Sequence, residues 1–575
     1  MPSYGSYPSS PTAMQHNYSQ RSQTVSEGSD SEDAIERSAS FDPGVVPPTH
    51  DRRTLVLCFD GTGDQFDADN SNIVQLFQML RKDNPSQQLV YYQAGIGTYT
   101  SPAIATQRTA NFEKLVDMAI AKDLDAHVMS GYEFLMQNYE ANDKICIFGF
   151  SRGAYTARAL AGMIHKVGLL PRCNHQQVPF AYAMFARDDP EGWRQSIAFK
   201  KAFSNDVGVD FLGVFDTVAS VGIIPKHLPF TQSNNCIRFF RHAISLDEHR
   251  AKFKANQYQR TPDDQIQGAA GMPPSNPHRR PQTHREHRYH HPETSQAHDF
   301  VAKEDEHRGE ADFDKRERSV WETDVLEVWF AGVHCDVGGG SVPNGTRHSL
   351  ARIPLRWMIR ETFLAGTGIQ FHRSSFAGIG IDPKHLYPIV VPRPPGLEPT
   401  AELVEKMVKL AKHEKKIERH EDGSIKKDKK HGKRKDPGES ARPHQRPHHS
   451  HTLSGTGQTL AEETQADYGE VVLEMSEEDE EIRDALCPMF DTLQLSKSWW
   501  ILEVLPLRQH VLRPEPETGT VPKVIMNLGR AREIPRGDGK LLVHRSVKMR
   551  MEAEGLTGGV YKPRARFPVE PTWVD

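Results

Sequence analysis

A serine framed by glycines is the residue of this sequence best suited to act as a nucleophile. Residues 149–153 read Gly-Phe-Ser-Arg-Gly, which is the pattern G-x-S-x-G around Ser151. Small residues on both sides of a serine allow a tight, strained turn that projects the hydroxyl away from the backbone. A hydroxyl is a weak nucleophile by itself, so it needs a base to take its proton and an acid to orient that base. The pattern therefore predicts nucleophilic attack by Ser151 on a carbonyl carbon.

The segments on either side of this serine are those that such a turn requires. Ile145 to Phe148 is a short apolar run typical of a buried strand, and the alanine-rich segment from Ala154 to His165 favours a helix. Strand, G-x-S-x-G and helix in this order resemble the nucleophile elbow of an α/β-hydrolase. The helix would also direct backbone N–H groups and a partial positive charge at the reacting centre. A chance match in a glycine-containing turn is the alternative, and the flanking segments argue against it.

The base and the acid are predicted from chain order, which in hydrolases with this elbow runs from serine to acid to histidine. Asp216 and Asp336 each follow an apolar run, and both fit as the acid. His544 comes late in the chain, after another apolar run, and fits as the base. His334 competes with it, but in an extended segment His334 and Asp336 would share a face as structural neighbours.

Backbone N–H groups beside the serine are the predicted stabilisers of a negatively charged intermediate. One belongs to Arg152, directly after the nucleophile. The other is expected from Gly61 or Thr62, in the polar turn that follows the first predicted strand.

A metal site is the competing use of some of these residues. Asp60, His334 and Asp336 are suitable ligand types, but their spacing matches no strong metal signature. We therefore expect no metal ion and no cofactor.

The apolar runs also predict the sheet that positions these side chains. Strands are predicted at residues 55–59, 89–93, 145–148, 209–216 and 325–333, and helices at 72–81, 112–139, 154–165, 236–249 and 353–363. Strands alternating with helices predict an α/β fold with a mostly parallel, doubly wound sheet. In such a sheet the strand tips would gather Asp60, Ser151, Asp216 and Asp336 at one edge.

Composition divides the chain into one folded domain and several low-complexity segments. Hydrophobic content is 37% and the mean hydropathy is −0.62, so disordered segments are expected to dilute the folded part. We predict a disordered tail at 1–52, a catalytic domain at 53–552 and a C-terminal extension at 553–575. Two insertions are predicted inside the domain, a histidine-rich one at 257–320 and one at 398–482 that is rich in lysine and ends in acids.

Charge, cysteines and hydropathy limit the classes of protein that fit. A net charge of −5 gives no general case for binding nucleic acid. The six cysteines are scattered without a C-x-x-C pair, which is typical of reduced thiols. Neither a signal peptide nor an apolar run of membrane-spanning length is recognisable. These features favour a cytoplasmic or nuclear location.

Six short motifs occur in order along the chain. They are Phe-Asp-Gly-Thr at 59–62, Gly-Ile-Gly-Thr at 95–98, Gly-Phe-Ser-Arg-Gly-Ala at 149–154, Phe-Asp-Thr-Val-Ala-Ser at 215–220, His-Cys-Asp-Val-Gly-Gly-Gly at 334–340 and His-Arg-Ser-Val at 544–547. Together they resemble a large, mostly uncharacterised α/β-hydrolase family of fungi and bacteria, which includes phospholipase effectors of the bacterial type VI secretion system. The resemblance covers roughly residues 53–390 and 485–552 and is more specific than any one motif.

The resemblance implies a Ser-Asp-His triad, which we assign to Ser151, Asp336 and His544, with Asp216 and His334 as the alternative acid and base. It also implies cleavage of a carboxylic ester through an acyl-enzyme, with lipid or phospholipid as a substrate class. As partners we expect an ester or lipid substrate and a transient contact with a membrane surface, and no nucleic acid. The alternative is a catalytically silent hydrolase fold that serves as a scaffold or binding protein, because fold does not imply function.

Overall fold

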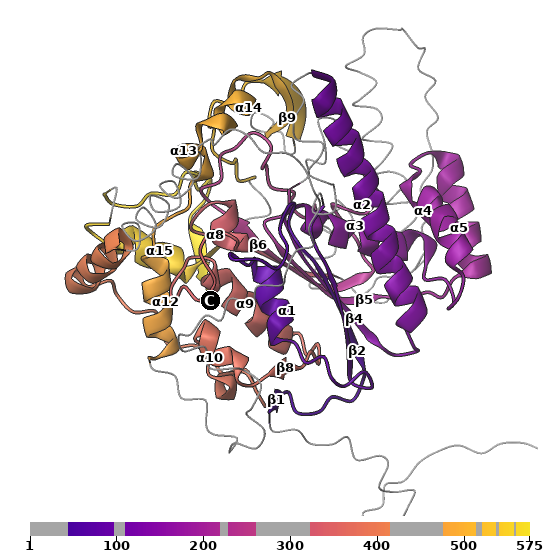
Figure 1. The fold of residues 1–575 in the computed structure, drawn as a ribbon, viewed down its shortest axis with the longest axis horizontal. Coiled ribbons are helices and arrows are strands. Elements are labelled where there is room, and N and C mark those ends of the chain that lie inside the picture. The colour runs from indigo at the N-terminus through magenta and orange to yellow at the C-terminus, as the bar shows by residue number, and fades with distance from the viewer. Residues whose placement is uncertain are drawn as a thin grey trace, which may run out of the picture. The chain divides into compact units, whose positions relative to one another are not determined.

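An eight-stranded sheet forms the centre of the computed structural model of the protein (Figure 1). Its strands in spatial order are β12 (Pro571–Val574), β11 (Leu541–His544), β7 (Asp324–Phe330), β6 (Ile237–Ser245), β5 (Val209–Phe215), β4 (Lys144–Phe150), β2 (Thr54–Phe59) and β3 (Gln88–Gln93). Every neighbouring pair is parallel. The predicted parallel α/β sheet is therefore confirmed.

The structure describes most, but not all, of the chain. The described residues are 44–96, 110–218, 228–259, 323–413, 475–512, 520–535, 540–556 and 559–575, without the side chains of residues 110–123, 508, 510, 512, 520 and 522. Most of the predicted tail and of both predicted insertions lies outside these residues. Within the described part of the chain, no helix combines the length and the apolar character needed to cross a membrane.

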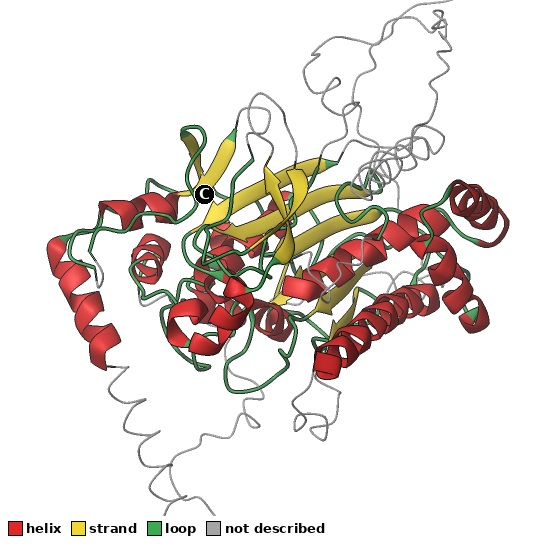
Figure 2. Ribbon diagram, turned by 90° about the horizontal axis from the view of Figure 1, so that it is seen from above, coloured by secondary structure: helices red, strands yellow, loops and turns green. Residues whose placement is uncertain are grey.

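Helices cover both faces of the sheet (Figures 1 and 2). One face carries α2 (Ala110–Asn138), α3 (Ser151–Val167), α4 (Val178–Ala186) and α5 (Pro190–Phe203), and the other carries α1 (Asn72–Met79), α9 (Arg352–Leu364), α12 (Glu477–Ala485) and α15 (Arg545–Glu552). Strand β4 contains the apolar run from Ile145 to Phe148, whose side chains alternate between the two layers. Ile145 and Ile147 pack into the core on the α3 face, whereas Cys146 and Phe148 pack into the core on the α9 face. A strand between two helical layers needs apolar side chains on both sides.

Smaller elements complete the fold around this sheet. They are β1 (Val45–Val46) and β8 (Phe371–His372), the hairpin of β9 (Leu507–Leu512) and β10 (Thr520–Ile525), the short helices α8 (His334–Gly338), α10 (Ser375–Ile379), α13 (Thr492–Leu495) and α14 (Trp500–Val504), and 3₁₀ turns at His175–Gln177, Pro383–His385 and Lys497–Trp499.

One predicted helix is a strand. Residues 236–249 are predicted to form a helix, yet they contain β6. Two of its polar side chains are buried and have partners on other elements. Arg241 Nε donates to Glu361 at 2.6 Å, and His242 Nδ1 bonds to Glu327 at 2.8 Å. These hydrogen bonds satisfy both side chains inside the fold, so neither marks a solvent-facing helix side.

The folded part also extends beyond the predicted domain limits. Val45 and Val46 are buried in β1, inside the predicted tail, and β12 adds a strand from the predicted extension to the main sheet. The acidic run at residues 477–481, predicted to end an insertion, lies in α12 and packs against α9. Residues 44–52, 477–482 and 559–575 are thus parts of the folded unit.

Candidate active site

The turn at Ser151 has the geometry expected of a nucleophile elbow. Ser151 follows β4 directly, begins α3 and has a φ of 59°, a region that residues with a side chain rarely adopt. A Cβ at Gly149 would lie 2.6 Å from the Cα of Ala154, and one at Gly153 would lie 2.3 Å from the carbonyl oxygen of Asp60. Both glycines of the pattern are therefore required by close backbone contacts, as the sequence predicts.

Two side chains connect Ser151 to a buried acid. The Ser151 hydroxyl lies 2.8 Å from Nε2 of His334, and Nδ1 of His334 lies 2.6 Å from Oδ2 of Asp216. Asp216 directly follows β5, and His334 begins α8 just after β7. All three residues are at least 95% buried. The chain order is serine, acid, histidine, which is the order of α/β-hydrolases.

The surroundings of His334 fix its ring and its charge. The imidazole lies between the rings of Phe150 and Phe253, with centroids 4.7 and 4.8 Å away. Its backbone N–H donates to Oε2 of Glu248 at 3.2 Å. Burial lowers the pKa of His334, and the hydrogen bond to Asp216 opposes this only in part. The ring is therefore neutral near pH 7, as a general base must be.

The acid of this set is held by an arginine. Both carboxylate oxygens of Asp216 accept hydrogen bonds from Arg532, at 2.5 and 2.9 Å, and Oδ1 also accepts the backbone N–H of Ser245 at 2.8 Å. Burial opposes ionisation of Asp216, but Arg532 and His334 outweigh it and hold the pKa of the carboxyl well below its usual range. Asp216 is therefore an anion able to orient His334.

His544, assigned above as the base, has other contacts. Its Nδ1 bonds to the Ser546 hydroxyl at 2.8 Å and accepts the Ser546 backbone N–H at 3.2 Å, which caps α15. Its Nε2 lies 3.7 Å from Glu481, and its ring stacks on Phe330. Burial lowers the pKa of His544 to about 3. Within the described residues, the structure brings Ser151 to His334, the alternative base, and not to His544.

Asp336, assigned above as the acid, caps a helix. Its carboxylate accepts the backbone N–H of Val333 at 2.9 Å, at the start of α8, and that of Phe490 at 3.1 Å. Burial raises the pKa of Asp336 to about 7. Residues 334–338 are helical, so the extended segment on which the sequence argument relied is absent there. The alternative acid, Asp216, is the one that the structure brings to a histidine.

The predicted oxyanion donors lie next to the elbow. Arg152 is the second residue of α3, directly after the nucleophile. The Gly61 N–H donates to its neighbour Asp60 at 2.8 Å, so it is already engaged. A Cβ on Gly61 would lie 2.7 Å from the Phe150 ring, which places the turn at residues 61–62 beside the nucleophile. That Thr62 is the second donor beside Arg152 therefore stays a prediction.

The part of the chain that contains Ser151 and its partners also matches a known protein family. Residues 53–361, more than half of the chain, match the family described as T6SS, phospholipase effector Tle1-like, catalytic domain. The chain belongs to this Tle1-like family. Ser151, Asp216 and His334 all lie within the matched residues, whereas His544 lies outside them.

Three proteins similar to the chain can be named. An uncharacterised protein of Saccharomyces cerevisiae is 32% identical over an alignment of 409 positions, which covers 56% of this chain and 59% of that protein. An uncharacterised protein from Pseudomonas aeruginosa of known structure is 19% identical, with a TM-score of 0.28 over 55% of this chain and 46% of that one. The Tle1 effector bound to the VgrG spike of the type 6 secretion system is 17% identical, with a TM-score of 0.23 over 52% of this chain and 53% of that one. The chain thus spans about half of the length of these relatives.

Arg532 belongs to this site, although no sequence pattern predicts it. It lies outside the Tle1-like match, in a short segment with no motif around it. Because its partner Asp216 is more than 300 positions away in the chain, only the folded structure shows the contact. An alignment of close relatives is the one sequence signal that could have found it.

The three residues considered above as a metal site have other partners. Asp60 accepts hydrogen bonds from Ser71 at 2.6 Å and Tyr92 at 2.7 Å. His334 is engaged by Ser151, and Asp336 caps α8. These hydrogen bonds connect Asp60 to the start of α1 and to β3.

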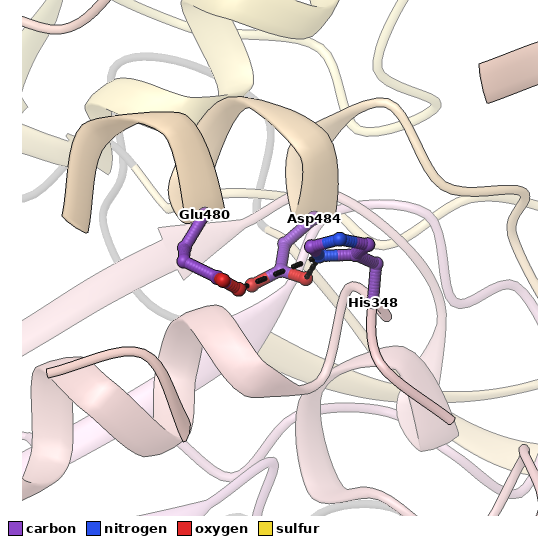
Figure 3. Close-up of side chains that lie close together, drawn as sticks. All are labelled: His348, Glu480 and Asp484. Atoms are coloured by element: carbon purple, nitrogen blue, oxygen red, sulfur yellow. Dashed lines mark hydrogen bonds and ion pairs between the residues drawn. The ribbon is translucent and has the colours of Figure 1, made fainter. Parts of the chain in front are cut away.

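A second group of ligand types, His348, Glu480 and Asp484, is drawn in Figure 3. Nη1 of Arg352 lies 2.9 Å from Glu480, 3.1 Å from Asp484 and 3.4 Å from Nδ1 of His348. Arg356 adds a hydrogen bond of 2.6 Å to Asp484. Guanidinium groups already supply the positive charge that these acids require, so the group is an ion-pair cluster between α9 and α12.

Proposed function

We propose that this Tle1-like protein is a serine hydrolase that cleaves a carboxylic ester of a lipid or phospholipid. The observation that carries the proposal is the continuous series of hydrogen bonds from Ser151 through His334 to Asp216. The strained elbow at Ser151 supports it, because strain of this kind is stored at functional sites. The family description, which names phospholipase effectors, supports the substrate class.

The contacts of these residues suggest how each would act. Nε2 of His334 takes the proton of Ser151 as the serine oxygen attacks the ester carbonyl, and Asp216 stabilises the resulting imidazolium. Backbone N–H groups of Arg152 and Thr62 would bind the oxyanion. His334 then gives the proton to the departing alcohol, which leaves an acyl group on Ser151. Water activated by the same histidine would release the acid.

The first test is labelling of the purified chain with a fluorophosphonate probe, which reacts with activated serines. Ser151→Ala and His334→Ala should each abolish labelling, because loss of the nucleophile or of the base removes on the order of 10⁴-fold or more of the rate in such triads. Asp216→Asn should slow labelling strongly. The matched variant Asp336→Asn should leave it unchanged, since an amide oxygen can still accept both backbone N–H groups.

His544→Asn is the control for the base, because asparagine also caps helices well. Labelling that persists in His334→Ala but disappears in His544→Asn would overturn the proposed triad. A folded wild-type chain that no probe labels would instead favour the silent hydrolase fold.

A further inference from the structure

Large apolar side chains are exposed together in one short part of the chain. We call this part, residues 490–512 and 520–530, the platform. Six of its apolar side chains are between 50 and 68% exposed: Leu495, Ile501, Val504, Val524, Met526 and Leu528. Single exposed apolar residues are common on proteins, but a dense group marks a binding surface.

Contacts between the segments of the platform bring them together. A Cβ on Gly529 would lie 3.6 Å from the ring of Trp500. The backbone N–H of Leu528 donates to the carbonyl of Glu503 at 3.0 Å. The carboxylate of Glu503 is buried and accepts the backbone N–H of Ala251 at 2.7 Å. Helix α14 therefore turns its acid toward the fold and exposes Ile501 and Val504. It lies beside α13 and β9 (Figure 1).

The exposed charged side chains described within the platform are all basic. Among the described side chains of the platform, the exposed charged ones are Lys497, Lys523 and Arg530. Its two described acids, Asp491 and Glu503, are buried and hydrogen-bonded to other parts of the fold. An apolar surface with a basic rim and no exposed carboxylate among its described residues complements an anionic lipid surface.

The platform is also connected to the candidate active site. Trp499 packs edge-on against Phe253 at 5.5 Å, and Phe253 packs against the ring of His334 at 4.8 Å. Arg532, just after the platform, holds Asp216. A surface that docks on the platform would therefore lie near the triad. The platform is outside the residues that match the Tle1-like family, so it is a feature of this chain beyond the matched domain.

We propose that the platform docks on a bilayer that contains anionic phospholipid and so brings Ser151 to its substrate. The role in substrate delivery rests on the proposed function. The docking itself does not, because binding to vesicles requires no hydrolysis. Trp500, partly exposed at the edge of the apolar surface, is the residue type that favours the interface between lipid and water.

The test is sedimentation of the full chain with vesicles of phosphatidylcholine, alone or mixed with phosphatidylglycerol. Ser151→Ala is used as the background, so that no lipid is consumed. We expect binding to the mixed vesicles that weakens with salt. Ile501→Ser with Val504→Ser should reduce it about tenfold or more, since two exposed aliphatic side chains leave the lipid. Leu364→Ser with Ile389→Ser, which are equally exposed elsewhere, should not.

Unchanged vesicle binding in Ile501→Ser with Val504→Ser would overturn the proposal. The proposal would also be overturned if light scattering showed that the chain self-associates and that this double variant does not, because the platform would then join two copies of the chain. Val524→Ser with Met526→Ser repeats the test on β10, independently of the fold of α14. With Ser151 intact, both pairs should keep fluorophosphonate labelling. A chain that binds vesicles but is never labelled would refute the proposed hydrolysis alone.

Discussion

At the scale of single residues, the distinctive feature of the candidate site is the arginine on its acid. Asp216 accepts hydrogen bonds from His334 and, on both oxygens, from Arg532. Arg532 is in turn held by the carbonyl of Phe253 and by Ser245. A bidentate guanidinium neutralises much of the carboxylate's charge. Arg532 therefore limits how strongly Asp216 can raise the pKa of His334, and acts as a positioning residue for the triad.

Arg532→Met tests this role through the pH dependence of fluorophosphonate labelling. In the wild type, burial keeps the pKa of His334 below its ordinary value of about 6.5, so labelling should stay constant until the pH falls below that value. Without the arginine, the full charge of Asp216 favours protonated His334 and raises its pKa. The loss of labelling on acidification should then begin at higher pH.

Arg532→Lys is the matched control, because it keeps the positive charge and loses the two-point contact. It should label more slowly with little change in the pH at which labelling falls. If Arg532→Met and the wild type lose labelling at the same pH, Arg532 is only a structural residue.

At the scale of elements, the elbow could be predicted because all its signals lie within residues 145–165. The choice of histidine could not. His334 and His544 both satisfy the order rule, and what separates them is sheet order, which the sequence does not show. In the sheet, β7 stands two places from β5, and β11 lies one place further out. His334, just after β7, can reach Asp216, whereas His544 ends β11 and caps α15.

The location of charged runs in the fold is difficult to predict from sequence for a related reason. The acidic residues 477–481 were predicted to be part of an insertion, because so many acids usually face water. In the fold the four glutamates of this run pair with arginines far away in sequence, such as Arg360 on Glu477 and Arg393 on Glu481. Such long-range compensation can be recognised only after the fold is known.

The buried ion pairs between α9 and α12 are expected to be important for stability. Arg356 bonds to Asp484 at 2.6 Å, and both side chains are almost fully buried. Arg356→Met leaves Asp484 with less compensation, so the free energy of unfolding in urea should fall by about 3 kcal/mol. Lys409→Met removes a pair of similar length, with Glu405, that is largely exposed, and should change it little. Equal changes in the free energy of unfolding for the two variants would show that burial does not increase the contribution of the Arg356–Asp484 pair to stability.

At the scale of the whole molecule, the Tle1-like match ends before the fold does. Residues 53–361 contain the candidate triad, yet β11 and β12 complete the sheet and α12 covers α9 from later in the chain. Arg532 reaches Asp216 from the same later part. By themselves, the matched residues would leave the β7 edge of the sheet unpaired. They would also lack the acids of α12 that pair with the buried arginines of α9. The C-terminal part is therefore an integral portion of the folded unit that carries the candidate triad.

Expression of the chain as two fragments, residues 42–413 and 475–575, tests this dependence. Together the fragments should co-purify, because β7 pairs with β11 and because the α9–α12 ion pairs need both partners. Ser151 should then react with the fluorophosphonate probe. The larger fragment alone should be poorly soluble and unlabelled, because it lacks both the cover of α9 and the arginine on Asp216. A larger fragment that is soluble and labelled by itself would show that the triad needs neither. Arg532→Met in the smaller fragment separates the two requirements: it should preserve co-purification and shift the pH dependence of labelling, as it does in the intact chain.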